Sequence, residues 1–167
     1  RILTNDDIAH MVETKDARIQ ERTGIARPHI ISCDESTATM SAEASKKALE
    51  MSGIAPEEID MIILSTASPN AVVPCVACQV QEMIGAKNAV CYDLNAACSG
   101  FLYAYCTAQA FIRSGIYKTI LIIGAESLSN LVNWKDRSTC ILFGDGAGAA
   151  VVQADPDAPF ECVLHSD

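Results

Sequence analysis

The sequence predicts an α/β fold, in which helices cover both faces of a sheet. The predicted strands at residues 60–66 and 119–124 each contain four consecutive apolar residues, which is typical of strands buried on two sides. Segments with apolar residues at helical spacing alternate with these strands. A chain of 167 residues is long enough for one domain with a sizeable core.

The composition narrows the class of protein. Half of the residues are hydrophobic but only 5% are aromatic, so the core must be built mainly from Ala, Ile, Leu, Val and Met. The net charge is −9, and no run of Lys or Arg is present, which argues against a nucleic-acid-binding protein. The apolar stretches are too short to span a bilayer. We therefore expect a soluble, cytoplasmic protein.

Capping residues, glycines and prolines predict where the helices of the first half begin and end. Thr4 or Asn5 can cap the first helix, whereas Gly24 ends the second and Gly53 ends the third. Two further helices begin with Pro, whose missing N–H is tolerated in a first turn. These helices are predicted at residues 5–13 and 16–22, from Thr37 up to Gly53, at residues 56–58, and from Pro74 up to Gly85.

The long helix that starts at Thr37 has an amphipathic pattern. Its apolar stripe and its polar face are each formed by residues at helical spacing. The stripe consists of Met40, Ala44, Ala48 and Met51, and the polar face of Glu43, Lys46, Lys47 and Glu50. We expect the polar face to be solvated.

The second half continues the alternation of strands and helices. A short strand at residues 89–92 precedes a buried helix at 101–113, which stops at a Ser-Gly pair. The strand at 119–124 is followed by a polar excursion and by a final strand at 149–153. The chain begins almost at a helix cap, and its last residues start a strand without a return. Both ends are therefore predicted to be truncated.

Cys98 is the strongest candidate nucleophile. It lies where the strand at 89–92 passes into the helix at 101–113, so the positive end of the helix dipole favours its thiolate form. Its small neighbours, such as Ala97 and Gly100, leave room for a substrate. From this position alone, a reactive nucleophile and an inert, buried thiol both remain possible.

The glycine-rich segment at residues 144–148 resembles a phosphate-binding turn. The dinucleotide-binding fingerprint, however, requires a helix after the glycines, and here a strand follows. A backbone that passes close to the active site, where a side chain would obstruct it, explains the glycines better. The sequence also lacks the Gly-x-Ser-x-Gly elbow of a serine hydrolase.

The cysteines do not form the pattern of a small disulfide-stapled fold. Cys75 and Cys78 have the spacing of half a zinc site or of a redox pair, but no second pair follows and the histidines are dispersed. We expect no metal site and reduced thiols. Apart from Cys98, the cysteines are expected to pack in the core; they are Cys33, Cys75, Cys78, Cys91, Cys106, Cys140 and Cys162.

Several stretches together resemble the β-ketoacyl-acyl carrier protein synthase III family, the thiolase-fold condensing enzymes that start fatty-acid synthesis. In chain order they are residues 22–25, 77–81, 93–101, 136–137 and 141–149. The resemblance implies one half of a thiolase-like fold, with a central mixed sheet and helices on both faces. Residues 1–167 would form the N-terminal half-domain that carries the nucleophile, and the C-terminal half would be absent.

The resemblance also implies an activity. Cys98 would take an acyl group from acyl-coenzyme A as a thioester, for decarboxylative condensation with malonyl-acyl carrier protein. Its backbone N–H would contribute to the oxyanion hole. The implied partners are acyl-coenzyme A, acyl carrier protein and a second copy in a homodimer, without nucleic acid, membrane, metal or cofactor. The family's catalytic His and Asn belong to its other half, so we expect this chain alone not to condense.

Four positions align with the coenzyme A site of the family, and three of them match the family residues. Arg22 matches an arginine near the nucleotide, Arg137 matches one that packs against the adenine region, and Thr14 matches a threonine of the same site. Arg18 stands where many members have a tryptophan that stacks on adenine. Because a guanidinium also stacks on a base, we expect coenzyme A to bind here in a different manner.

Four further positions match the acyl-binding region. Leu128, Ile141 and Leu142 align with its apolar wall. Val73 aligns with a residue that enters the pocket of the partner subunit, and members with a bulkier aromatic there take short primers. The smaller side chain of Val73 therefore predicts longer or branched acyl groups.

Other functions remain open at this stage. A secondary-metabolite acyltransferase or a hydroxymethylglutaryl-coenzyme A-type synthase could share the same half of the fold. An inactive scaffold could keep the fold for dimerisation, and its Cys98 would be no more reactive than the other cysteines. A zinc or redox module built on Cys75 and Cys78 is a third possibility.

Overall fold

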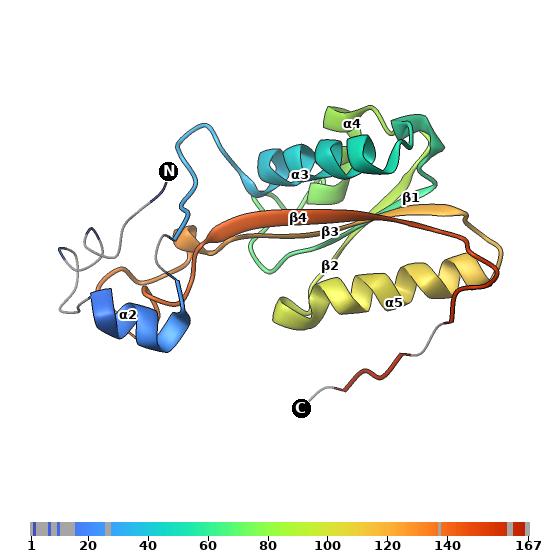
Figure 1. Ribbon diagram of the computed structural model, residues 1–167. Helices are drawn as coiled ribbons and strands as arrows, with labels where there is room; N and C mark the ends of the chain where they lie inside the picture. Colours follow the sequence, from blue (N-terminus) through green and yellow to red (C-terminus); the bar gives the residue numbers. More distant parts are fainter. Residues whose placement is uncertain are drawn as a thin grey trace.

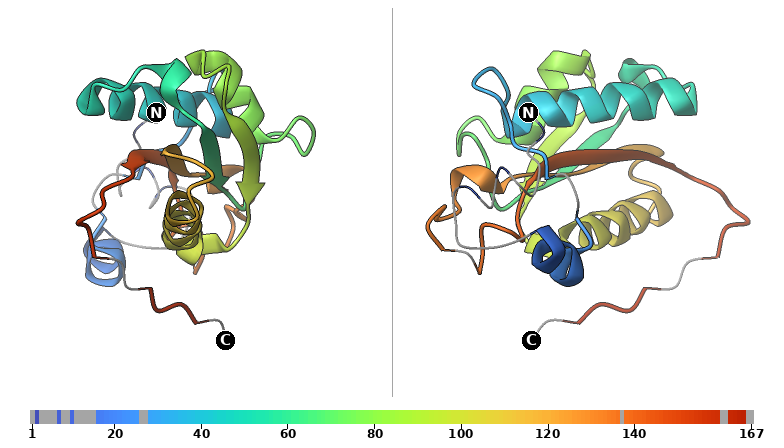
Figure 2. Two further views of the ribbon diagram at one scale, coloured as in Figure 1. Left: turned by 90° about the vertical axis from the view of Figure 1, so that its right-hand side faces the viewer. Right: turned by 60° about the vertical axis from the view of Figure 1, so that its left-hand side comes forward.

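The computed structural model arranges the chain in layers, with helices above and below a sheet (Figure 1). The structure describes residues 2, 7, 10, 16–25, 28–136, 138–159 and 162–165, except for the side chains of Asp16, Arg18 and Arg22. The helix predicted at residues 5–13 lies almost entirely outside this part of the chain. The view along α5 in Figure 2 shows the two helical layers on opposite sides of the sheet.

Four strands form one mixed sheet in the order β2-β1-β3-β4. The strands are β1 (Met61–Ser65), β2 (Val90–Leu94), β3 (Thr119–Ser127) and β4 (Asp145–Gln153). β1 pairs in parallel with β2 and with β3, whereas β4 runs antiparallel to β3. This arrangement confirms the mixed sheet and the central position of the strand predicted at 60–66.

The helices confirm most of the predicted boundaries. α2 (Asp16–Thr23), α3 (Thr37–Ser52), α4 (Val76–Ile84) and α5 (Gly100–Arg113) are α-helices, and η1 (Pro56–Glu58), η2 (Ala97–Ser99) and η3 (Leu128–Asn130) are single 3₁₀ turns. Ser36 caps α3 by accepting a hydrogen bond from the N–H of Thr39. Gly53 ends the same helix in the left-handed conformation, with a φ of 70°.

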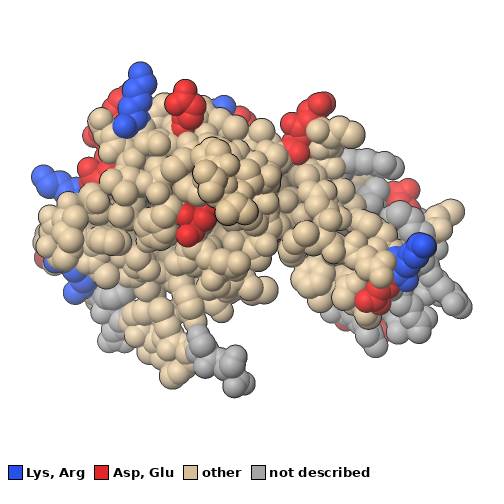
Figure 3. Space-filling model, turned by 180° about the vertical axis from the view of Figure 1, so that it is seen from behind, with Lys and Arg blue, Asp and Glu red and all other residues tan. Residues whose placement is uncertain are grey.

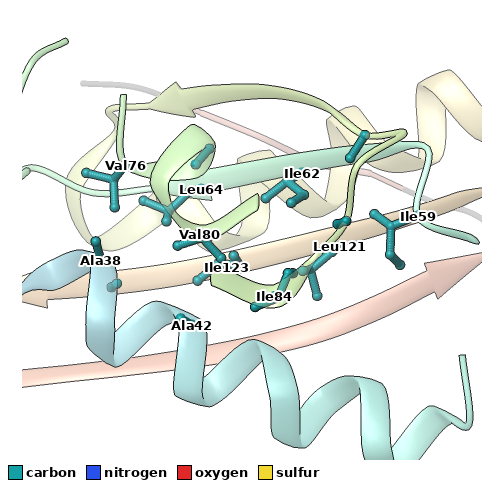
Figure 4. Packing of buried hydrophobic residues seen from close by; sticks show 14 of the residues in the cluster. Ala38, Ala42, Ile59, Ile62, Leu64, Val76, Val80, Ile84, Leu121 and Ile123 are labelled. Atoms are coloured by element: carbon teal, nitrogen blue, oxygen red, sulfur yellow. The ribbon is translucent and has the colours of Figure 1, made fainter. Parts of the chain in front are cut away.

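Side chains that alternate along the central strands build a separate core on each face of the sheet. Ile62 and Leu64 of β1, together with β3, pack against α3 and α4 (Figure 4). Met61 and Ile63 point to the other face, where they pack with Ala104 and Ala108 of α5. Because helices cover both faces of the sheet, side chains on both sides of a central strand are buried, and such a strand must be largely apolar.

The apolar stripe predicted on α3 is not the buried face of this helix. The buried face is formed by small residues, namely Thr37, Ala38, Ser41, Ala42, Ser45 and Leu49. The hydroxyls of Ser41 and Ser45 donate to the carbonyls four residues earlier, at 2.6 and 2.7 Å, so these polar groups can be buried. Met51 is 89% exposed, and Met40 lines a surface groove of about 500 Å³ between α3 and β4.

Two expectations about the second half also need correction. The final strand begins at Asp145 rather than at residue 149, because Gly146 and Gly148 pair with Glu126 and Gly124 along the long strand β3. The predicted buried helix is covered on one side only. Leu102 of α5 is 61% exposed, since the sheet contacts only the opposite side of the helix.

The cysteines are less buried than predicted. All eight are free, and Cys140 is the one that is fully buried. The expectation of core packing is wrong for Cys33 and Cys162, which are exposed because they lie outside the helices and strands. The others of the predicted core set are half-buried.

In the described part of the chain, no helix is both long and apolar enough to cross a membrane. Seen from behind, the coloured Lys and Arg side chains are scattered along the edges of the molecule and do not gather into one patch (Figure 3). This distribution agrees with the absence of a basic run in the sequence.

Candidate active site

Cys98 lies in η2, between the end of β2 and the start of α5. Its side chain is exposed. The N–H of Thr66, just after β1, donates to the carbonyl of Leu94 at 3.0 Å, which holds the start of the cysteine loop against the carboxyl end of β1. Cys98 is therefore presented at the carboxyl edge of the sheet, where ligands of open α/β sheets commonly bind.

The backbone immediately before Cys98 is strained. Ala97 has a φ of 44°, and within the described residues it is the one non-glycine residue with a positive φ. This conformation is uncommon for a residue with a Cβ atom and costs about 1–2 kcal/mol. The turn brings the chain from β2 directly into α5, with Cys98 in the connection.

Gly100 allows α5 to begin against β1. A Cβ atom at this position would lie 1.8 Å from Oγ of Ser65 and 2.9 Å from its Cβ, so a larger residue does not fit. Gly124 of β3 leaves room for Phe101, the next residue of α5, because a Cβ atom at Gly124 would lie 3.2 Å from the Phe101 ring. Small residues at these contacts fix the start of α5, and with it the place of Cys98.

The electrostatic environment of Cys98 is set by α5. The first N–H groups of a helix have no partner within it and carry partial positive charge. The first turn of α5 contains no acidic residue that would neutralise this charge.

Asp93 connects the cysteine loop to α4. Its two carboxylate oxygens accept hydrogen bonds from the N–H groups of Val76 and Ala77, each at 2.8 Å. These groups lie in the first turn of α4, so a negative charge meets the positive end of the helix. Asp93 was part of the motif around Cys98, but its contact with a helix 16 residues earlier was not predicted.

Two other acidic residues support the same edge of the sheet and were missed by the sequence analysis. Glu126 accepts hydrogen bonds from the N–H of Ala67, at 2.9 Å, and from the hydroxyl of Ser68. Asp145 accepts from the N–H groups of Ile31 and Ser129, both at 2.8 Å. The sequence offered one signal for them, namely a single acidic residue near the end of a largely apolar strand. A partly buried carboxylate needs hydrogen-bond partners.

The structure places the predicted acyl-binding residues in different environments. Ile141 is only 7% exposed and packs with Cys140 and with Ile19 of α2. Leu142 is 51% exposed, and Leu128 is half-buried in η3. Val73 is 85% exposed and precedes α4. The structure therefore brings Ile141 to the helix that carries two of the predicted coenzyme A residues.

The predicted coenzyme A residues are described only in part. Arg18 and Arg22 lie on α2, but their side chains are outside the described part of the structure. Thr14 and Arg137 are outside it altogether. Their assignment to coenzyme A stays a prediction.

A metal centre finds no support among the described residues. None of their His, Cys, Asp and Glu side chains form a group of three or more that could hold an ion. Cys75 and Cys78 lie with their Sγ atoms 3.4 Å apart, as a pair.

Comparison with known proteins relates the chain to one family. Residues 92–167 match the family model of 3-oxoacyl-[acyl-carrier-protein (ACP)] synthase III. Over its full length, the chain is 51% identical to β-ketoacyl-[acyl-carrier-protein] synthase III of Clostridium acetobutylicum and covers 51% of that protein. The chain thus spans about half the length of this curated relative.

Solved structures give the same result. The crystal structure of 3-oxoacyl-[acyl-carrier-protein] synthase III from Aquifex aeolicus is 48% identical, with a TM-score of 0.90 over 94% of this chain and 51% of that one. The priming β-ketosynthase of the R1128 polyketide pathway is 36% identical, with a TM-score of 0.91 over 95% of this chain and 47% of that one. With its thiolase-like α/β fold and its sequence similarity throughout, the chain resembles one half of the β-ketoacyl-[acyl-carrier-protein] synthase III proteins.

Proposed function

We propose that this chain is the nucleophile-bearing, N-terminal half of an enzyme that starts fatty-acid synthesis by acyl transfer and condensation. The observation that carries the proposal is the exposed Cys98, held in a strained turn at the start of α5. This geometry suits a nucleophile rather than a buried, inert thiol. The 51% identity with a curated synthase III supports the same activity.

The first half-reaction loads the acyl group. The Cys98 thiolate attacks the thioester carbonyl of acyl-coenzyme A, and the negative charge that develops on the oxygen is stabilised by the backbone N–H of Cys98 and by the start of α5. The tetrahedral intermediate expels the thiolate of coenzyme A. The acyl group then remains on Cys98 as a thioester.

The second half-reaction forms the carbon–carbon bond. Malonyl-acyl carrier protein loses carbon dioxide, and the resulting carbanion attacks the acyl thioester. This step releases the Cys98 thiolate and leaves a β-ketoacyl group on the carrier protein. No residue of this chain is assigned to the decarboxylation, so we propose that the chain alone at most accepts an acyl group.

Substrate binding is proposed for the residues that match the family pattern. Acyl-coenzyme A would contact three arginines and a threonine, and its acyl group would lie along an apolar wall. The proposed residues are Thr14, Arg18, Arg22 and Arg137 for coenzyme A, and Leu128, Ile141, Leu142 and the Val73 of a partner copy for the acyl group. The packing of Ile141 against Ile19 of α2 supports a common site. We further propose a homodimer that acts in the cytoplasm, uses acyl-coenzyme A as substrate and needs no cofactor.

Acyl transfer to Cys98 can be tested by mass spectrometry. A protein containing this chain is mixed with acyl-coenzyme A, and its mass is measured before and after digestion with trypsin. Cys98 lies on the peptide of residues 88–113, together with Cys91 and Cys106, and fragmentation distinguishes the three sites.

We expect one acyl group on Cys98, none on a Cys98→Ser variant, and an unchanged result for Cys91→Ser as the matched control. Acylation of Cys91 or Cys106 instead would contradict the proposed nucleophile. If Cys98 is no more reactive than the other cysteines, the inactive scaffold is the better explanation.

A priming ketosynthase of polyketide synthesis is the second candidate. The observation in its favour is the TM-score of 0.91 with the R1128 enzyme, although the sequence identity of 36% is lower than the 48% shared with the Aquifex aeolicus protein. The acyl-loaded protein can be offered malonyl groups on carrier proteins from either pathway. Preference for a fatty-acid carrier protein would support the first function, and preference for a polyketide carrier protein the second.

A further inference from the structure

Two thiols meet at the start of α4. Neither of them is the nucleophile of the proposed acyl transfer, which is Cys98. Cys75 is the N-cap residue of α4, and Cys78 lies in its first turn. The N–H groups of Cys78 and Gln79 donate to the carbonyl of Cys75 at 3.1 and 3.3 Å. The Cys75 thiol points at that of Cys78, and their Sγ atoms are 3.4 Å apart.

The backbone between the two thiols is held in place. Val76 and Ala77 donate their N–H groups to the carboxylate of Asp93, so both residues between the cysteines are anchored to β2. Both cysteines are half-buried. The facing orientation of the sulfurs is therefore built into the capping of α4, and only a small movement separates this contact from a covalent bond.

A small molecule can reach Cys75, one member of the pair, from the surface. A pocket of about 310 Å³ is lined by Cys75, Cys91 and Asp93, among others. Cys91 is a third thiol nearby, but it also donates to the carbonyl of Ala89 at 3.6 Å. Burial raises the pKa of Cys91 to about 12 and raises the pKa of Cys75 as well. Geometry therefore distinguishes the thiols, because the Sγ atoms of Cys75 and Cys78 face each other at 3.4 Å. The pair that is arranged to react is Cys75 and Cys78.

We propose that Cys75 and Cys78 form a reversible disulfide by exchange with a small disulfide such as oxidised glutathione. The thiolate of one cysteine attacks a sulfur of oxidised glutathione, which breaks the S–S bond, forms a mixed disulfide and releases one glutathione thiolate. The second cysteine then attacks the protein sulfur of the mixed disulfide and releases the other glutathione. Two protein thiols are oxidised, one glutathione disulfide is reduced to two thiols, and the two protons from the cysteines end on the glutathione sulfurs.

The sequence makes this modification easy to detect. Trypsin cleaves after Lys47 and Lys87 but not between them, so the peptide of residues 48–87 contains Cys75 and Cys78 and no other cysteine. The chain is equilibrated in buffers with increasing ratios of oxidised to reduced glutathione, free thiols are blocked with iodoacetamide, and the digest is analysed by mass spectrometry.

We expect this peptide to shift from a doubly alkylated form to an unalkylated form. The mass of the unalkylated form should be two hydrogens below that of the peptide with two free thiols. Excess reduced glutathione should reverse the change. The proposal is overturned if both cysteines stay alkylated in every buffer, or if they carry only glutathione.

Single Cys→Ser variants test whether the disulfide joins Cys75 to Cys78. Cys75→Ser and Cys78→Ser should each abolish the internal link and leave one cysteine that is alkylated or bound to glutathione. Cys91→Ser, which removes the neighbouring thiol, should keep the link unchanged. A cross-link from Cys91 to Cys75 or Cys78 would overturn the proposal. So would oxidation confined to Cys106 and Cys162, two further thiols that contact each other. None of these readouts depends on acyl transfer.

Discussion

At the scale of single residues, Gly100 is fully buried where α5 starts, and the space that a side chain would need is taken by Ser65. Replacing Gly100 by Ala forces a Cβ atom toward Ser65 Oγ, where only 1.8 Å is available, and the start of α5 must shift away from β1. We expect Gly100→Ala to lower the free energy of unfolding by about 1–3 kcal/mol, the usual penalty of overpacking. Urea unfolding followed by circular dichroism measures this difference.

The matched control for this prediction is Gly148→Ala. Gly148 lies in β4, its φ is not in the left-handed region, and no atom lies within 4 Å of a Cβ built there. We expect its free energy of unfolding to change by less than about 0.5 kcal/mol. Equal effects of the two substitutions would show that the contact with Ser65 does not decide the start of α5.

Val73 carries the prediction about acyl-chain length, which rests on the proposed function. Its side chain is 85% exposed, so a larger residue can be introduced without disturbing the core. We expect Val73→Phe to reduce acylation of Cys98 by long or branched acyl-coenzyme A while acetyl transfer is retained. Rates of acyl loading for a series of chain lengths measure the effect. A strict preference of the unmodified protein for acetyl-coenzyme A would rule out this explanation.

At the scale of elements, α4 depends on Asp93 of β2 for its N-terminal cap. Asp93→Asn removes the negative charge and one of two accepted hydrogen bonds, because the amide group has a single acceptor oxygen. We expect a loss of about 1–2 kcal/mol in the free energy of unfolding. Asp93→Ala, which removes both hydrogen bonds, should lose more.

Glu43→Gln is the control for the charge at Asp93. Glu43 forms an ion pair with Lys46 at 2.8 Å on the exposed face of α3. Such surface pairs contribute little to stability, and we expect no measurable change in unfolding. If Asp93→Asn behaves like Glu43→Gln, the cap does not stabilise α4.

At the scale of the whole molecule, half-buried thiols make stability sensitive to high pH. Burial is the main reason why the pKa of Cys91 is raised from the ordinary 9.0 to about 12, and burial also raises the pKa of Cys75. Between pH 9 and 12 the unfolded chain loses protons that the folded protein keeps. Folding stability should therefore be complete below pH 9 and fall as the pH rises above it.

Urea unfolding at pH values below and above 9 tests this effect. The Cys91→Ala variant removes one of the titrating groups and should lose less stability over the same interval. The same slope in both proteins would show that Cys91 keeps an ordinary pKa in the folded state.

The outer side of α5 is a second feature of the whole molecule. Leu102 of α5 and Ile116, which follows this helix, are each 61% exposed, and Tyr105 of α5 is 39% exposed. Exposed apolar surface of this kind favours association. We expect the 167-residue chain to associate with a second copy of itself through this face.

Sedimentation velocity can test this association. Leu102→Glu should shift the chain toward the monomer. Met51→Glu changes a residue that is 89% exposed on α3, a helix on the other face of the sheet, and should leave the association unchanged. A monomeric unmodified chain would contradict the expectation.

Local sequence determined much of this architecture. Four consecutive apolar residues in β1 and in β3 identified strands covered on both faces, and Gly24, Gly53 and Gly85 marked the ends of helices. The position of Cys98 between a strand and a helix followed in the same way. These features are encoded by neighbouring residues, so a reading of the sequence is sufficient to find them.

Only the tertiary structure decided which residues from distant segments meet. Small residues rather than Met40 and Met51 form the buried face of α3, because close approach to the sheet outweighs the larger apolar side chains. Likewise, Asp93 reaches α4, and Glu126 reaches the turn after β1. Such contacts depend on how the chain folds back on itself, and no local pattern specifies them. The sequence located Cys98 between a strand and a helix, whereas long-range packing determined how it is held.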